Sequence, residues 1–401
     1  MKPPKPPPAT DNPFRTAPGS EPPALVGRDE ESSAARYSFN LTRSGAPAQP
    51  IVFTGLRGMG KTALLRHCIA EASANHAIVV YAEASASEPL ATTLQHGIER
   101  ARRESASLSQ KLKSGFDKVL EALPRTSFEL PNDIGAVSLA SRHKDDAVLL
   151  NALEDLNDAV RHNGRYLVFA IDEIQDAPVD GLRDLVRFVH ATAGTTRPVY
   201  LLAAGLHGSR EHLHEVRTYT ERWRYFRLGL LTPEQTKDAI AIPAHERGVS
   251  IAPAALERLA QESAGYPFFV QEYASAAWLA HHGDAITQDE VERVIPGVRR
   301  ILEDDFYDAR FRLLTPRECA YVLAMAELGP GPHTTGEIAA QFGTNSETVS
   351  SIRHQLAKKD VIYSPASGMA EFRIPLTERY VTQHKDELER RARESRVQRR
   401  R

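Results

Sequence analysis

The chain has 401 residues, of which 41% are hydrophobic and 25% charged, and its formal net charge is -2. A chain of this length and composition is expected to form two or three globular domains. The near-zero net charge excludes a polycation, so any nucleic-acid surface must be local. The sequence predicts no membrane span and no signal peptide, and its two distant cysteines are typical of reduced core residues; we therefore expect a cytoplasmic protein without membrane contact.

The N-terminal stretch, residues 1–23, is rich in proline, with a dense run directly after Lys2. Such a stretch has too little apolar surface to form a core, and repeated proline favours extended backbone. The composition therefore predicts a disordered tail over residues 1–23, with order beginning at residue 24.

A glycine-rich turn follows the β-prone residues Ile51–Thr54 and precedes a helical pattern. Its spacing, Gly55-x4-Gly60-Lys61-Thr62, is the P-loop pattern, in which glycines let successive backbone N–H groups point at an anion and the helix N-terminus adds its positive dipole end. Lys61 is placed to reach the β- and γ-phosphates of ATP, and the Thr62 hydroxyl to hold Mg²⁺; an ordinary glycine turn between strand and helix is the alternative. The predicted nucleotide-binding residues are Gly55, Gly58, Met59, Gly60, Lys61, Thr62 and Ala63.

An apolar segment, Arg165–Ile171, ends abruptly in the acids Asp172 and Glu173. Parallel strands that are buried on both faces have this continuously apolar composition, and ligands bind at their carboxyl ends. Mg²⁺ prefers hard oxygen ligands, so Asp172 is the predicted metal ligand beside Thr62. Glu173 is the predicted catalytic residue that orients or deprotonates the attacking water. The alternative is a helix cap or a solvated strand end.

Strand-like and helical patterns alternate through the first half of the chain, with further strands expected at 77–82 and 198–204. Such alternation predicts an α/β fold in which helices cover both faces of a parallel sheet. We expect a P-loop three-layer parallel sheet, the ATPase core, over residues 24–231.

The part of the core that is hardest to interpret is residues 106–143, to which we assign no function. A helix is expected at 108–123, and a hairpin or a loose loop at 124–141 because proline and glycine interrupt short apolar runs. The next stretch, 145–162, has the periodicity of an amphipathic helix.

From residue 232 the pattern is helical, and residues 232–308 are predicted to form a helical lid. Residues 309–380 have three helical patterns followed by two short β-prone runs, which predicts a winged helix-turn-helix. In this region Thr344 and Glu347 have capping-box spacing and are expected to open the third helix. Residues 381–401 form a charged tail in which arginine dominates the end.

The third helix of the predicted winged helix carries the candidate DNA-binding residues. Basic residues outnumber acidic ones from Gln341 onward, so this part of the chain has a local positive charge. Phosphate contacts dominate the affinity of such modules, and duplex DNA is the expected partner. The alternative is a winged helix used for protein contacts, followed by a solvated tail. The candidate residues are Ser350, Arg353, His354, Lys358 and Lys359.

With these motifs, the chain resembles AAA+ P-loop ATPases of the origin-recognition-like class, in particular bacterial ATP-binding proteins of that class. The matching segments are Leu25–Glu30, Thr220–Arg222 and Gly265–Gln271, and the resemblance covers roughly residues 24–300. It implies that Val26 and Arg28 lie near the adenine and that Pro267 of the lid contacts the nucleotide. It also implies that Arg222 is a catalytic arginine finger that acts on a neighbouring copy, which requires a homo-oligomer. A surface ion pair of Arg222 and Arg224 with Glu221 is the alternative.

Two sensor residues of the family are missing from this chain. The place of the first sensor reads Ala204-Gly205-Leu206-His207, so His207 or Ser209 would have to substitute for it. No arginine occurs in Phe268–Tyr273, where the second sensor is expected. The lid motif is shared with STAND ATPases, which resemble the chain in this segment.

The predicted function is that of an ATPase that binds ATP and Mg²⁺, hydrolyses ATP, and couples its nucleotide state to DNA binding or assembly. Three alternatives remain open. They are a slow STAND-like nucleotide switch that regulates transcription or defence, a transposition-type ATPase regulator that assembles on DNA, and a protein-docking scaffold.

Overall fold

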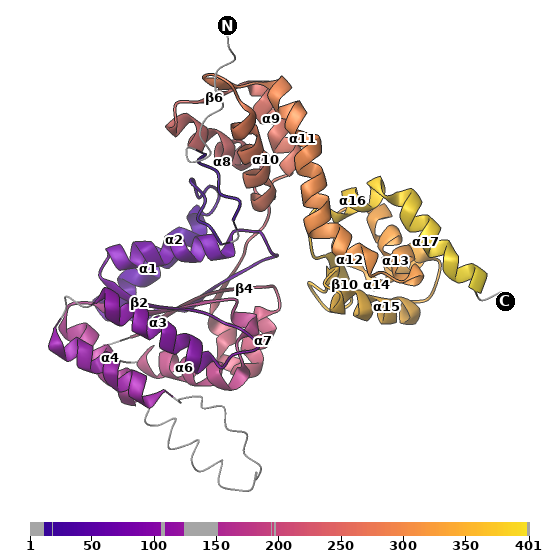
Figure 1. The fold of residues 1–401 in the computed structure, drawn as a ribbon. Helices are drawn as coiled ribbons and strands as arrows, with labels where there is room; N and C mark the ends of the chain where they lie inside the picture. The colour runs from indigo at the N-terminus through magenta and orange to yellow at the C-terminus, as the bar shows by residue number, and fades with distance from the viewer. Residues whose placement is uncertain are drawn as a thin grey trace.

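The computed structural model describes residues 12–17, 19–105, 109–123, 151–193, 195 and 198–398. Figure 1 shows a sheet-containing core, a helical unit beside it and a C-terminal domain to one side of both. No helix among these residues is long and apolar enough to cross a membrane. Both cysteines, Cys68 and Cys319, are free and buried, as expected of core residues.

A five-stranded sheet forms the centre of the core expected over residues 24–231, and its neighbouring strands pair in parallel. Every residue of β3 and β4 is buried, which explains why these strands lack the polar alternation of a half-exposed strand. In spatial order the strands are β2 (Ala77–Glu83), β3 (Tyr166–Asp172), β4 (Tyr200–Gly205), β1 (Ile51–Thr54) and β5 (Arg224–Arg227).

Helices cover both faces of this sheet, so the predicted three-layer α/β fold is confirmed. Alternate strand residues pack into two separate clusters: Val168 belongs to one and its neighbour Phe169 to the other. The first cluster contains α1 (Asp29–Ser44) and α2 (Lys61–Ala74). The second contains α3 (Leu90–Glu104), α4 (Gln110–Ala122), the helical residues 151–162, α6 (Val179–Ala193) and α7 (Ser209–Val216).

The segment that the sequence left without a role is described in part. The helix predicted at 108–123 is confirmed as α4. The helix predicted at 145–162 is helical over its described part, 151–162. The hairpin or loop expected at 124–141 lies outside the described residues.

Four helices follow the sheet, and side-chain caps set the start of two of them. Thr232 and Gln235 form a capping box at the first, and Thr287 and Glu290 at the last. Two short strands, β6 (Ser250–Ile251) and β7 (Ala285–Ile286), pair in parallel between them. The helices are α8 (Pro233–Glu246), α9 (Pro253–Ser263), α10 (Pro267–Ala280) and α11 (Gln288–Leu302).

The C-terminal domain follows a π-helical turn, η4 (Glu303–Asp308), and the short α12 (Ala309–Arg312). A three-stranded antiparallel sheet of order β8-β10-β9 packs with its helices. The predicted capping box of Thr344 and Glu347 is wrong, because the Asn345 side chain accepts from the Thr348 N–H and caps α15 instead. The elements are α13 (Pro316–Glu327), β8 (His333–Thr334), α14 (Thr335–Phe342), α15 (Ser346–Lys358), β9 (Ile362–Tyr363), β10 (Met369–Phe372), α16 (Thr377–Gln383) and α17 (Lys385–Gln398).

The N-terminal segment corrects the prediction of a disordered tail up to residue 23. Phe14 is only 4% exposed and meets the Trp278 ring edge-on, with 6.3 Å between centroids. The Asn12 side-chain amide donates to the Ser275 hydroxyl at 2.8 Å, which ties the segment to α10. The prediction failed because the apolar surface that buries Phe14 belongs to a helix more than 250 positions away. Residues 1–11 lie outside the described part of the chain.

Candidate nucleotide site

The P-loop connects β1 to α2 and adopts the backbone geometry for which its glycines are needed. Gly58 and Gly60 have φ values of 72° and 82°, a region that glycine adopts readily and other residues rarely. A Cβ atom at Gly58 would lie 2.3 Å from the Tyr266 hydroxyl oxygen, so this position is also sterically restricted to glycine. Lys61 is the first residue of α2, which places the positive end of that helix at the loop.

The Lys61 side chain is enclosed by the loop and is 5% exposed. Its ammonium group donates to the Leu56 carbonyl oxygen at 2.9 Å. Burial lowers the pKa of Lys61, whereas the charges of Glu173 and Asp172 act in the opposite direction. The loop therefore holds a desolvated cation close to its carbonyl and N–H groups, where a phosphate oxygen would be a stronger partner.

The carboxylate of Asp172 is at the end of β3 and is 2% exposed. Its oxygens accept from the Glu173 N–H at 3.0 Å and from the Tyr81 hydroxyl at 3.3 Å, and its side chain is also hydrogen-bonded to Thr62. Burial raises the pKa of Asp172. The Thr62 hydroxyl, which is part-exposed, and the buried Asp172 carboxylate supply the hard oxygens that suit Mg²⁺, and a bound cation would favour the charged carboxylate.

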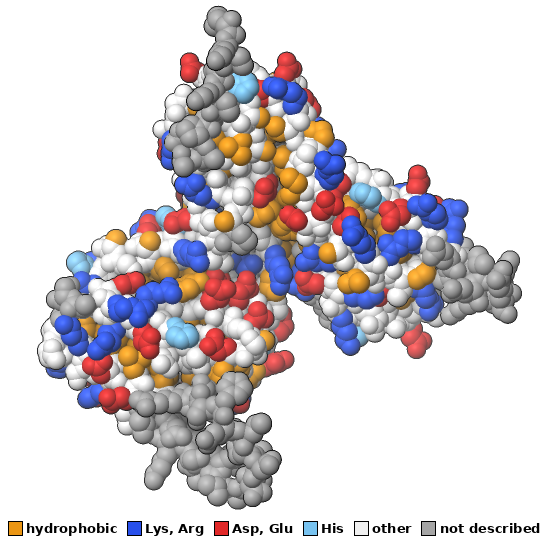
Figure 2. Space-filling view, viewed as in Figure 1, with side chains coloured by type: hydrophobic (Ala, Val, Ile, Leu, Met, Phe, Trp, Pro, Cys, Tyr) orange, Lys and Arg blue, Asp and Glu red, His pale blue; other side chains and the backbone are white. Residues whose placement is uncertain are grey.

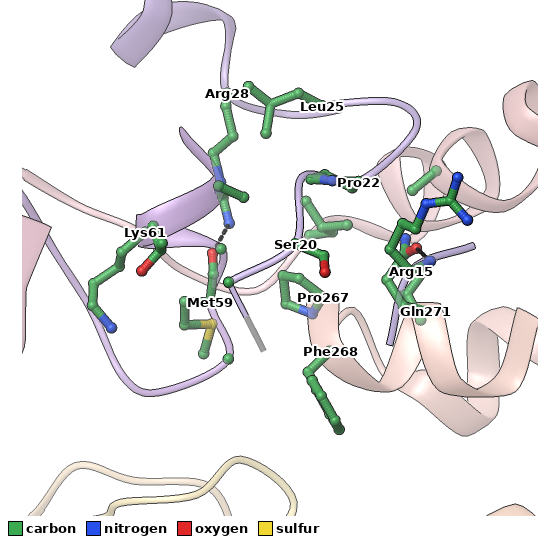
Figure 3. A pocket seen from close by; sticks show the side chains of 18 of the residues that line it. Arg15, Ser20, Pro22, Leu25, Arg28, Met59, Lys61, Pro267, Phe268 and Gln271 are labelled. Carbon is green, nitrogen blue, oxygen red and sulfur yellow. Dashed lines mark hydrogen bonds between the residues drawn. The ribbon is translucent and has the colours of Figure 1, made fainter. Parts of the chain in front are cut away.

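A cavity of about 470 Å³ opens beside the P-loop, and Figure 3 shows its walls. Lid residues Pro267, Phe268 and Gln271 form one side of it. The N-terminal segment forms another with Arg15 and Ser20, a wall that the sequence analysis missed. Of the residues predicted to bind the nucleotide, those that line the cavity are Val26, Arg28, Gly58, Met59, Gly60, Lys61, Thr62, Ala63 and Pro267, together with Glu173; Gly55 is not among the lining residues.

Arg28, predicted to lie near the adenine, also supports the P-loop from behind. It is 7% exposed, and its guanidinium donates to the Met59 carbonyl at 3.3 Å and to the Gly229 carbonyl at 2.8 Å. Figure 3 shows its side chain reaching toward Met59. Burial lowers the pKa of Arg28, but the group stays charged.

Tyr266 joins the lid to the P-loop, a contact that the sequence analysis did not single out. Its side chain is fully buried, and its hydroxyl donates to the Arg57 carbonyl oxygen at 2.8 Å. The ring occupies the space that Gly58 leaves open by having no Cβ. The lid therefore contacts the P-loop directly through Tyr266. The sequence indicated this contact only by placing a tyrosine next to Pro267.

The two candidates for the missing first sensor lie in different environments. Ser209 is fully buried, and its hydroxyl is 3.4 Å from the Gln175 side-chain oxygen. His207 is half-buried and stacks on Tyr363 of the C-terminal domain, with 5.0 Å between ring centroids. Burial and nearby cations lower the pKa of His207 to about 4, so the ring is neutral near pH 7.

Arg222 is exposed in η3 (Thr218–Arg222), which directly precedes β5. It therefore lies at the amino end of that parallel strand, whereas the P-loop follows the carboxyl end of β1. Glu221, the partner expected for a surface ion pair, contacts the His214 ring at 3.2 Å instead. A role of Arg222 in catalysis would thus have to be on another copy of the chain.

The candidate DNA-binding residues on α15 differ in how free they are. His354 and Lys358 are exposed, whereas Arg353 donates to the Thr335 hydroxyl at 3.0 Å. The Ser350 hydroxyl donates to the helix backbone at Ser346.

Lys359 requires a correction, because the structure gives it a partner within the domain. Its ammonium lies 2.6 Å from a carboxylate oxygen of Glu318, which is 4% exposed, and donates to the Leu313 carbonyl at 2.8 Å. Lys359 therefore neutralises a buried acid rather than reaching outward.

The parallel sheet, the P-loop and the acids at the end of β3 define a P-loop nucleotide-binding protein of the α/β class. Residues 24–202 match the AAA ATPase domain family, so this part of the chain is an AAA+ P-loop ATPase domain, as its motifs predicted. Residues 304–381 match a family described as a domain of unknown function.

Several solved structures resemble the chain at low sequence identity. The Walker-type ATPase PABY2304 of Pyrococcus abyssi is 16% identical with a TM-score of 0.57, over 92% of this chain and 99% of that one. The Aeropyrum pernix ORC1 protein in complex with DNA is 17% identical with a TM-score of 0.44, over 92% and 94%. The Thermotoga maritima RuvB Holliday junction branch migration motor is 14% identical with a TM-score of 0.44, over 89% and 95%. At this identity, the likeness to the Pyrococcus protein shows the fold alone. No curated protein matches this chain.

Proposed function

We propose that this protein binds ATP together with Mg²⁺ and hydrolyses it to ADP and phosphate. The observation that carries the proposal is that Lys61 and Thr62 of the P-loop and Glu173 after β3 line one cavity, with the Asp172 side chain hydrogen-bonded to Thr62. A buried cation, a hydroxyl–carboxylate pair and a further acid are the groups that phosphoryl transfer to water requires.

In the proposed reaction, Lys61 exchanges its 2.9 Å bond to the Leu56 carbonyl for a phosphate oxygen. Thr62 and Asp172 would hold Mg²⁺, and the ion would supply positive charge that stabilises the phosphate oxygens. Glu173 lines the cavity and accepts a proton from the water whose oxygen attacks the γ-phosphorus, while the bond to the bridging oxygen breaks. Pro267, Val26 and the N-terminal segment would enclose the remainder of the nucleotide.

We propose that the C-terminal domain is a winged helix-turn-helix that engages duplex DNA through α15. Support comes from the succession of α13, α14 and α15 followed by the strand pair β9 and β10, and from the exposure of His354 and Lys358. Figure 2 shows Lys and Arg side chains spread over this domain among acidic ones, so binding would depend on a few free cations and on salt. The division of the chain at residues 231, 308 and 380 and the cytoplasmic location remain predictions.

One experiment tests hydrolysis and the proposed oligomer together: ATPase rate per chain against protein concentration, with and without duplex DNA. We expect a rate that rises with concentration in the wild type and not in Arg222→Ala, with Arg224→Ala as the control for loss of an exposed arginine. A rate per chain that is independent of concentration in both the wild type and Arg222→Ala would contradict the role of Arg222 as an arginine finger.

Glu173→Gln should bind ATP and not turn it over. Turnover by Glu173→Gln would show that Glu173 is not needed for catalysis.

A slow nucleotide switch is the second candidate, and the enclosure of the cavity favours it. The N-terminal segment and the lid both contribute walls, and Tyr266 ties the lid to the P-loop, so exchange of nucleotide requires several contacts to open. Nucleotide that stays bound through purification, with negligible turnover and no response to DNA, would select this candidate. Turnover stimulated by DNA would exclude it.

A further inference from the structure

Gln175 lies in the short helix η2 (Ile174–Asp176), two positions after Glu173, and uses its whole side-chain amide. Its nitrogen donates to a Glu173 carboxylate oxygen at 2.8 Å and to one of Asp176 at 3.2 Å. Its oxygen accepts from the Leu206 N–H at 2.9 Å and from the Ser209 hydroxyl at 3.4 Å. An amide has two donors and two acceptor sites, so this group is saturated and its orientation is determined.

The neighbouring residues fit closely around the Gln175 side chain and hold it in this position. A Cβ atom at Gly205, the last residue of β4, would lie 2.6 Å from the Gln175 oxygen and 2.2 Å from the Ser209 hydroxyl. Glu173 itself has a φ of 48°, and its N–H donates to the Asp172 carboxylate at 3.0 Å. The Glu173 carboxylate is thus held by an amide that is itself anchored to the end of β4.

The end of β4 is also where the C-terminal domain meets the ATPase core. His207, next to Leu206, stacks on Tyr363 of β9 with an interplanar angle of 23°. Arg227, at the end of β5, donates to the Tyr363 hydroxyl at 3.1 Å and lies 3.4 Å from a carboxylate oxygen of Glu371. Figure 2 shows basic and acidic side chains side by side where the core and the C-terminal domain meet.

We infer that Gln175 is a positioning residue for Glu173 and that it makes the position of Glu173 depend on docking of the β9–β10 hairpin. The inference rests on the proposed function, in which Glu173 accepts the proton of the attacking water. The contacts are contiguous: Tyr363 packs on His207, the adjacent Leu206 N–H donates to Gln175, and Gln175 donates to Glu173. Movement of the hairpin would shift His207 and with it the Leu206 N–H that orients the amide.

The test compares ATPase kinetics of Gln175→Leu and Gln175→Glu in the full chain. Gln175→Leu removes all four hydrogen bonds at similar volume. Gln175→Glu keeps the acceptors for Leu206 and Ser209, but it replaces the donors with a carboxylate oxygen that repels the neighbouring carboxylates of Glu173 and Asp176. Gln175 is not among the residues lining the cavity, so both variants should lower kcat about tenfold or more while KM and ADP affinity stay unchanged. If Gln175→Leu does not fold, Gln175→Glu still decides the question.

A second background separates positioning from general damage. In Glu173→Gln, which has lost the proton acceptor, adding Gln175→Leu should lower the residual rate no further. An equal loss in both backgrounds, or an unchanged kcat in both Gln175 variants of an active enzyme, would overturn the inference alone. A wild type without ATPase activity would overturn the proposed function, and the inference with it.

The hairpin half of the inference is tested at Tyr363, with a matched pair of variants. Tyr363→Leu removes the ring that stacks on His207, whereas Tyr363→Phe keeps the ring and loses the hydroxyl. We expect Tyr363→Leu to lower kcat several-fold more than Tyr363→Phe, and to have no effect in Gln175→Leu. An effect of Tyr363→Leu that persists unchanged without Gln175 would show that docking acts by another route.

Discussion

The P-loop site and helix α15 were both recognised from short sequence patterns, but they differ in how their charged groups are used. In the P-loop, the buried cation Lys61 donates to a backbone carbonyl within its own loop and keeps no carboxylate partner at hydrogen-bond distance in the described residues. On and after α15, Lys359 pairs with the buried Glu318, and Arg353 is bonded to Thr335. The P-loop thus leaves its lysine available for a bound ligand. On and after α15, by contrast, some basic side chains make contacts within the domain and others stay exposed.

The largest effect is expected from replacing Lys61, the lysine of the P-loop. Lys61→Ala should weaken ATP binding about 100-fold or more, because a desolvated charge-assisted bond to phosphate contributes about 3 kcal/mol. Isothermal titration calorimetry with ATP and Mg²⁺ measures this, with Lys237→Ala as the control for loss of a lysine from the surface of the lid. Retained affinity in Lys61→Ala would contradict the assignment of the P-loop as the phosphate site.

Lys359→Ala tests the opposite side of the comparison, a cation committed to structure. The substitution leaves the Glu318 carboxylate buried without its ion pair, which should lower the free energy of unfolding by about 3 kcal/mol. Chemical denaturation measures the change, and Lys358→Ala, at an exposed neighbour, should leave stability nearly unaltered. Equal stability of the two variants would mean that the Glu318 contact contributes little.

The contact between lid and P-loop should have an intermediate effect. Tyr266→Phe removes the hydroxyl that donates to the Arg57 carbonyl at 2.8 Å, which should cost about 1–2 kcal/mol. If this bond holds the P-loop in its binding geometry, nucleotide affinity should fall by a corresponding factor of about 10. Thermal unfolding and nucleotide titration measure the two quantities, and Tyr37→Phe, at an exposed tyrosine, is the control. A loss of stability with unchanged nucleotide affinity would limit Tyr266 to a packing role.

A pH dependence is expected where the C-terminal domain rests on the core. Burial, together with nearby Arg227 and Lys61, lowers the pKa of His207 to about 4, whereas an unfolded histidine titrates near 6.5. Because the pKa of His207 is lower in the folded protein than in the unfolded chain, the neutral ring makes its full contribution to stability above about pH 6.5. This contribution is lost as the pH falls toward about 4. The melting temperature of the wild type should fall more steeply with decreasing pH over this range than that of His207→Gln. Parallel curves of melting temperature against pH would contradict the assignment.

The smallest effect is expected for Lys358, the free cation of the comparison. Lys358→Ala should weaken DNA binding modestly and reduce the slope of log affinity against log salt by about 1, because one phosphate contact is lost. Lys359→Ala, measured where it remains folded, should leave that slope unchanged. Fluorescence anisotropy with a labelled duplex over a range of salt concentrations measures both, and identical slopes for Lys358→Ala and the wild type would remove α15 from the proposed interface.

The sequence by itself determined the parts of the molecule whose geometry is local. The P-loop, the apolar strand ending at Asp172 and the helices of the lid depend on glycine freedom, burial periodicity and capping within a few residues, and those predictions did not need the fold. The exception was the cap of α15, where Asn345 and Thr344 were both suitable and the structure uses Asn345.

Only the tertiary structure decided which distant segments complete the site. Phe14 and Arg15 belong to a proline-rich stretch that gives no local signal of order, yet they pack on α10 because that helix offers an apolar surface and the Gln271 side chain. Tyr266 on Gly58, Lys359 on Glu318 and Tyr363 on His207 are likewise pairs separated by tens to hundreds of positions. Local periodicity carries no information about such contacts, since they depend on how the layers pack.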